Sequence, residues 1–118
     1  MNTMIGVVSH HEREVEELQS DREFAVGYLQ AALESLANPD ERAGALLALR
    51  AIADAYGGLG AIAKQAGISR ESLYRSLGPK GNPTLKTLIA VLNAVGMRLS
   101  VQPLDQAQES QTQVSRAS

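Results

Sequence analysis

The segment from Leu59 to Gly78 constrains the fold most, because it places two short helical patterns on either side of one central glycine. Ala63 provides a small side chain where two closely packed helices meet. Four residues later, Gly67 provides the backbone freedom that a tight turn with a positive φ requires. The apolar residues expected on the inner faces are Ile62, Ala66, Ile68 and Leu73. Two helices joined in this way are typical of a helix-turn-helix, which we predict at residues 59–78.

Apolar residues recur at helical spacing in three further segments, and each segment has recognisable ends. Asp21, Asn38 and Thr84 are the predicted N-caps of these helices, and Ser69 is the predicted N-cap of the second helix in the helix-turn-helix. The predicted helices are, in chain order, residues 21–36, 39–56, 59–65, 70–77 and 85–95. This pattern predicts an all-α fold, a bundle of about five helices.

The residues outside this bundle give weaker patterns. Met97 to Gln102 alternate between apolar and polar side chains, which predicts a short C-terminal β-strand. Its exposed edge would pair with a second copy in a homodimer; the alternative is an intrachain role, such as pairing with residues 5–8. Residues 1–20 are predicted to be an N-terminal extension, either flexible or with a short strand at 5–8 and a helix start at 12–18. The polar residues 104–118 are predicted to be a disordered tail.

The composition limits the kind of core and the chemistry available. Of the 118 residues 44% are hydrophobic but only 3% are aromatic, so the core has to be built from Leu, Ile, Val and Ala. The absence of Cys excludes disulfides and thiolate metal sites. No apolar run reaches the roughly 20 residues of a membrane span, and residues 1–8 do not have the pattern of a secretion signal. We therefore expect a cytoplasmic protein without membrane contact.

Charge is distributed unevenly along the chain, although the formal net charge is only −2. Residues 1–55 hold ten acidic and four basic side chains, a net charge of −6. Residues 56–104 hold six basic side chains and one acidic one, a net charge of +5. This asymmetry indicates two surfaces with different partners; the alternative is a gradient along a solvated surface.

The segment that begins at Ser69, SRESLYRSLGPKGNPTLKTLIAVLNAVGMRLSV, resembles the HigA-like addiction module antidote proteins. It is similar more broadly to the Xre family of Cro- and lambda-repressor-like proteins. The resemblance extends over residues 21–102, and it implies an antitoxin that binds DNA and is encoded beside a RelE/ParE-like toxin. Two positions depart from the family pattern: Leu59 replaces a phosphate-binding Gln, and Ser76 replaces an apolar residue.

In a helix-turn-helix the second helix enters the major groove of DNA, with the residues of its N-terminal part at the base edges. Leu73 and Leu77 are expected to point inward. The residues left to face the groove are then Arg70, Glu71, Tyr74 and Arg75. An arginine binds guanine through two hydrogen bonds, so Arg70 and Arg75 are the leading candidates. Glu71 either accepts from a cytosine amine or pairs with Arg75 one helical turn away, and the second role is favoured.

Phosphate contacts are expected around the helix-turn-helix and the loop that follows it, because such contacts position the recognition helix. The candidates are Ser69, Lys64, Lys80, Asn82, Thr84 and Lys86. Lys80 and Lys86 cluster near the capped start of the next helix, which favours a phosphate clamp over ordinary solvated charge. These residues make 21–103 the predicted DNA-binding domain.

Two functional hypotheses follow. The first is an antitoxin that binds operator DNA as a homodimer, represses its own toxin–antitoxin operon and neutralises a small basic toxin. The second is a stand-alone or prophage-type transcriptional repressor without a toxin partner. No pattern indicates an enzyme, a cofactor or a metal site, because His10 and Glu14 share a helical spacing but lack a third ligand.

Overall fold

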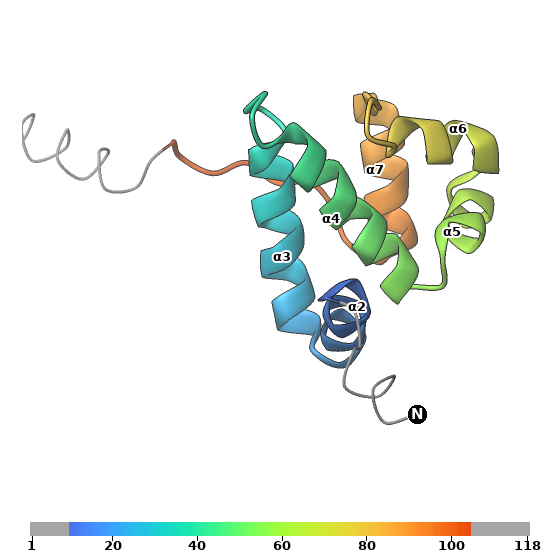
Figure 1. Ribbon diagram of the computed structural model, residues 1–118, viewed down its shortest axis with the longest axis horizontal. Helices are drawn as coiled ribbons and strands as arrows, with labels where there is room; N and C mark the ends of the chain where they lie inside the picture. Colours follow the sequence, from blue (N-terminus) through green and yellow to red (C-terminus); the bar gives the residue numbers. More distant parts are fainter. Residues whose placement is uncertain (1–9, 105–118) are drawn as a thin grey trace, which may run out of the picture.

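The structure, a computed structural model that describes residues 10–104, consists of six α-helices and contains no strand within that range. The helices are α2 (His10–Ser20), α3 (Arg22–Ser35), α4 (Arg42–Ala55), α5 (Leu59–Ala66), α6 (Arg70–Ser76) and α7 (Leu85–Ala94). The prediction of an all-α fold is thereby confirmed. In Figure 1, α3 lies on one side of α4, and α5 and α6 lie on the other. The predictions for residues 1–9 and 105–118 lie outside the described residues.

The core is centred on α4, which contributes six buried residues, more than any other described helix. Every buried side chain in residues 10–104 is Leu, Ile, Val or Ala, as the composition predicted. The largest fully buried side chains are Leu18, Leu46, Leu49, Ile52, Ile62, Leu73 and Leu77. Burying a side chain of this size stabilises the fold by about 1.5–3 kcal/mol. All six helices are therefore held by one shared aliphatic core.

Three of the four predicted N-caps are formed by side chains. The Asp21 carboxylate and the Ser69 and Thr84 hydroxyls each accept a hydrogen bond from the backbone N–H three residues later, at 3.0–3.1 Å. Gly67 ends α5 with a φ of +75°, in the left-handed region that the turn requires. The predicted starts of α3, α6 and α7 and the turn between α5 and α6 are thus confirmed.

The fourth predicted N-cap, Asn38, does not start a helix. Its side-chain oxygen accepts from the backbone N–H of Asp40 at 3.0 Å, and its carbonyl oxygen accepts from the N–H of Glu41 at 2.9 Å. These bonds close a turn, and α4 begins at Arg42 without a side-chain cap. An asparagine that satisfies nearby backbone groups competes with helix formation in this way. The predicted start at residue 39 is therefore wrong by three residues.

Residues 10–20, which we expected within an N-terminal extension, form α2 and pack on the rest of the bundle. Leu18 is only 1% exposed and belongs to the shared core. His11 ties α2 to α4, because its Nε2 lies 2.8 Å from Oδ2 of Asp54. The described helical body therefore extends to His10 and does not begin at residue 21. Leu18 is the one fully buried side chain of α2, which explains why the sequence pattern is weak there.

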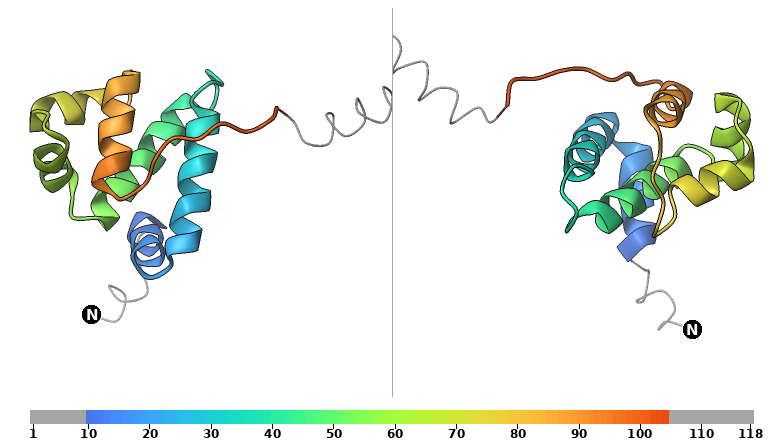
Figure 2. Two further views of the ribbon diagram at one scale, coloured as in Figure 1. Left: turned by 180° about the vertical axis from the view of Figure 1, so that it is seen from behind. Right: turned by 90° about the horizontal axis from the view of Figure 1, so that it is seen from above.

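The predicted strand at residues 97–102 does not form in the part of the chain that the structure describes. Arg22 fixes the start of this segment, because its guanidinium donates to the Gly96 carbonyl at 3.0 Å and to the Tyr56 hydroxyl at 2.9 Å. The chain then runs past α3 without secondary structure (Figure 2), and Val101 is 96% exposed. A strand needs a neighbour for its backbone groups, and no other described segment pairs with this one.

No single helix among the described residues combines the length and apolar character that a membrane crossing needs. Helices α4 and α5 reach these values only when taken as a pair, and the pair is bent by 86° at the break. The large buried side chains of both helices, Leu46, Leu49, Ile52, Leu59 and Ile62, belong to the shared core.

Alkaline pH is expected to destabilise the fold through Tyr28 of α3. Burial, the charge of Glu14 on α2 and a hydrogen bond to its carboxylate raise the pKa of Tyr28 from 10 to about 12. The folded chain therefore keeps this proton at pH values where the unfolded chain has released it. The contribution is complete below pH 10 and is lost as the pH rises through about 12. Urea unfolding between these pH values should show a steeper loss of stability for the unmodified chain than for Y28F, and parallel curves would contradict this.

Candidate nucleic-acid interface

Helix α6 is anchored on the bundle by two leucines, one at its centre and one at its end. Leu73 is 0% exposed and Leu77 is 2% exposed, as their spacing of four residues predicted. Ile62 and Ala63 of α5 are buried in the same core. Because this face is packed in the core, the opposite face of α6 is directed toward solvent.

The four residues predicted to face a DNA groove are all exposed, and they line one shallow hollow on the surface of α6. They are Arg70, Glu71, Tyr74 and Arg75. Tyr74 is also exposed, with 40% of its surface accessible to solvent. The structure thus brings the predicted groove-facing residues together on the outer side of the molecule.

Arg70 and Tyr74 contact each other one helical turn apart. The Arg70 guanidinium carbon lies 5.2 Å from the centre of the Tyr74 ring, and its Nη2 donates to the Tyr74 hydroxyl at 3.4 Å. The stem of Arg70 lies over α5, because its Nε is 3.7 Å from the place that a Cβ on Gly60 would take. The predicted ion pair between Glu71 and Arg75 does not form within 4.0 Å among the described residues. Both side chains extend into solvent instead.

Sequence reasoning missed a further cation at this surface, Arg50 of α4. Its guanidinium carbon lies 5.9 Å from the centre of the Tyr74 ring. Arg50 is half-buried, so its position is more restricted than that of a fully exposed arginine. The available signal was that Arg50 is the one charged residue in the sequence between Arg42 and Asp54. Arg50 lies close to α6 only because of tertiary packing, and an isolated charge in the sequence does not predict such packing.

The six predicted phosphate contacts are all exposed, but half of them already have a structural role. The Ser69 and Thr84 hydroxyls cap helices, and the Asn82 side-chain oxygen accepts from the Arg42 guanidinium. The other three are lysines with free access to solvent: Lys64, Lys80 and Lys86. The lysines are therefore the stronger candidates for anion contacts.

Replacing Gly81 with alanine is expected to displace the loop that carries Lys80 and Asn82. A Cβ on Gly81 would lie 2.0 Å from the carbonyl oxygen of Ser76 and 2.6 Å from that of Arg75. Both atoms are backbone at the end of α6, so the loop has to move, at a cost of about 1–3 kcal/mol or more. Urea unfolding followed by circular dichroism measures this loss.

The matched control is Gly27→Ala in α3, where an added Cβ meets nothing within 4 Å. This change is expected to stabilise the helix by about 0.5–1 kcal/mol, because alanine restricts the unfolded chain more than glycine does. Equal stability of the two variants would contradict the close approach at Gly81.

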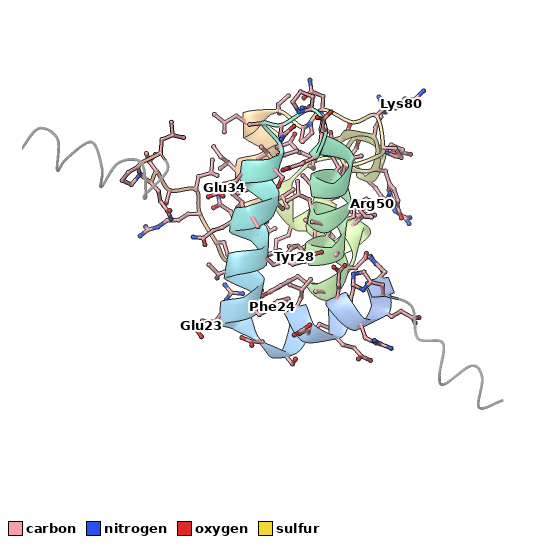
Figure 3. The ribbon with its side chains drawn as sticks, turned by 60° about the vertical axis from the view of Figure 1, so that its left-hand side comes forward. Glu23, Phe24, Tyr28, Glu34, Arg50 and Lys80 are labelled. Atoms are coloured by element: carbon pink, nitrogen blue, oxygen red, sulfur yellow. The ribbon has the colours of Figure 1, made fainter. Side chains whose placement is uncertain are left out.

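Four charged side chains can be compared in one view of the molecule. Figure 3 shows Glu23 and Glu34 on α3 at one side and Arg50 and Lys80 at the other.

The histidine and carboxylate pair at the start of α2 forms a contact but not a metal centre. His10 Nε2 lies 3.3 Å from Oε2 of Glu14. Within residues 10–104 no group of three His, Asp or Glu side chains is arranged to hold a metal ion. We therefore assign this pair no chemical role.

The fold and this surface define an all-helical protein with a cationic face on a short, capped helix. The family model described as "Probable addiction module antidote protein" matches residues 10–103, which is most of the chain. The chain therefore belongs to this family of probable addiction module antidote proteins. The antidote part of the resemblance seen in the sequence is confirmed.

One relative is an uncharacterized protein of Haemophilus influenzae. It is 49% identical to this chain over 41 residues, which cover 35% of this chain and 42% of the relative. The match thus spans less than half of that relative. No solved structure matches the chain.

Proposed function

We propose that this chain is a sequence-specific DNA-binding antitoxin of the HigA-like, Xre type, acting in the cytoplasm. In this proposal it represses its own toxin–antitoxin operon and neutralises a RelE/ParE-like toxin. The observation that carries the DNA-binding part of this proposal is that α6 has one buried face and one exposed, cationic face. Leu73 and Leu77 hold one face in the core, and Arg70, Tyr74 and Arg75 are exposed on the other.

In the proposed complex α6 is the recognition helix of a helix-turn-helix formed by α5 and α6. An α-helix with its side chains is about 10–12 Å in diameter, which fits a major groove about 12 Å wide. Arg70 and Arg75 would bind base edges, with guanine as the preferred partner of each guanidinium. Lys64, Lys80 and Lys86 would bind phosphates and fix the orientation of α6 on the duplex.

A single short helix makes few base contacts, which is why we propose a homodimer on two half-sites. Half-sites one turn of DNA apart are separated by about 34 Å, and both copies of α6 would enter the same side of the duplex. The segment 97–104 is the proposed contact between copies. It carries the exposed side chains Leu99, Val101 and Leu104, which a partner would cover.

The acidic side of the molecule is the proposed docking surface for the toxin. Glu16, Glu17 and Glu23 on α2 and α3 are exposed, and a basic partner would complement their charge. The test is co-purification with the product of the adjacent gene, at low and at high salt. If no complex forms while DNA binding persists, the chain is a stand-alone repressor and the antitoxin proposal fails.

The DNA-binding part is tested by a mobility-shift assay on the chain's own upstream promoter, repeated over a series of salt concentrations. Each phosphate neutralised by the protein adds about −0.9 to the slope of log affinity against log salt. We expect a steep slope and tighter binding to the promoter than to a scrambled duplex. Equal, weak binding to both duplexes would contradict sequence-specific recognition.

A further inference from the structure

Two arginines, one from α4 and one from α6, lie near the ring of Tyr74, and a third lines the same surface hollow as that ring. The guanidinium carbons of Arg50 and Arg70 lie 5.9 Å and 5.2 Å from the centre of the Tyr74 ring. Arg75 lines the same surface hollow as Tyr74. A cation at this distance from an aromatic face is attracted by the ring, and the cation keeps its full charge. The ring therefore attracts both Arg50 and Arg70 without neutralising either.

This cluster has no counter-charge of its own. Among the described residues, none of the three arginines has a carboxylate oxygen within 4.0 Å. Glu71 is the acid that lines the hollow, and it pairs with neither Arg70 nor Arg75. Like charges repel, and an anion bound beside these arginines would offset that repulsion. The positive charge of this surface is therefore unbalanced, and a bound phosphate would balance it.

We infer that Arg50 binds a backbone phosphate of the DNA beside the groove that α6 enters, an inference that rests on the proposed DNA-binding function. Arg50 extends from α4 and not from the recognition helix, so in the proposed complex it contacts the phosphate backbone at the edge of the groove and not the base edges. A guanidinium presents its donors in a planar fork that matches two phosphate oxygens. Arg50 thus adds affinity that does not depend on base sequence, while Arg70 and Arg75 discriminate between sequences.

The test is the variant R50Q, which keeps a polar side chain of similar helix propensity but shortens it and removes its charge. Affinity is measured by fluorescence anisotropy on the promoter duplex and on a scrambled duplex, over a series of salt concentrations. We expect R50Q to lower the salt slope by about 0.9. It should also weaken binding to both duplexes by the same factor, about tenfold.

Two further variants make the result specific to this position. R50K keeps the charge and should keep the salt slope. R13Q is the matched control, because Arg13 is an exposed arginine on α2, and it should leave both slope and affinity unchanged. If R50Q is unstable in thermal unfolding, R50M keeps an unbranched, uncharged side chain that packs like the aliphatic stem of arginine, and it gives the same readout.

The outcomes separate this inference from the function on which it rests. A salt slope for R50Q or R50M equal to that of R13Q would overturn the inference and leave the proposed DNA binding intact. A loss confined to the promoter duplex would also overturn it, because that is the result of a base contact. An unmodified protein that binds neither duplex would overturn the proposed function, and this inference with it.

Discussion

The variant with both Arg70 and Arg75 replaced by alanine is expected to bind promoter DNA about 100-fold more weakly than the unmodified chain, or weaker still. Each arginine that binds guanine through two hydrogen bonds contributes about 1–3 kcal/mol of discrimination, and both contacts would be lost. The fold should persist, because both side chains are exposed and α6 is anchored by Leu73 and Leu77. Fluorescence anisotropy at one fixed salt concentration measures the change.

The control for this variant is Arg13→Ala on α2, which removes an exposed arginine from a different helix. It is expected to leave promoter affinity unchanged. The double variant should bind promoter and scrambled duplexes almost equally, because it has lost discrimination and keeps its phosphate contacts. If it instead retained the full preference for the promoter, α6 would not be the recognition helix.

Leu73→Ala is expected to lower the free energy of unfolding by about 2–5 kcal/mol, the largest stability effect we predict for a single site. Leu73 is 0% exposed, and it is the one buried residue within α6 itself. Its truncation leaves a cavity and removes the central anchor of the helix. Because domains of this size are stable by only 5–15 kcal/mol in general, the variant should be close to unfolding. Urea unfolding followed by circular dichroism gives the value.

Ser72→Ala is the neighbouring control, since its side chain is exposed and its backbone N–H, which bonds the Ser69 cap, is kept. This change should alter stability by less than about 0.5 kcal/mol. A loss for Leu73→Ala no larger than that of Ser72→Ala would mean that α6 is not anchored on the bundle as described.

The parts of the fold that follow from local chemistry could be predicted from the sequence. Ser69 and Thr84 cap helices because a short hydroxyl side chain bonds a backbone N–H three residues on, whatever the surroundings. Gly67 takes a positive φ for an equally local reason. The orientation of α6 followed from the spacing of Leu73 and Leu77 alone, so the residues exposed on its outer face were also predictable.

The parts that depend on distant partners could not be predicted in this way. Residues 97–102 alternate as a strand does, but a strand forms only beside another, and the described residues provide none. Helix α2 has one fully buried side chain, Leu18, too weak a pattern to separate it from an extension. Arg50 reaches the α6 surface only through the packing of α4 against the α5–α6 side of the bundle.

The most direct test of the central claim is a titration of the ¹⁵N-labelled protein with its promoter duplex, followed by the backbone amide signals in NMR. The account predicts that the largest shifts fall on residues 69–76, with smaller ones around Lys64, Lys80 and Arg50, and that α2 and α3 change little. Shifts concentrated on α2 and α3, or no shifts at all at duplex concentrations above that of the protein, would contradict a DNA-binding role for α6.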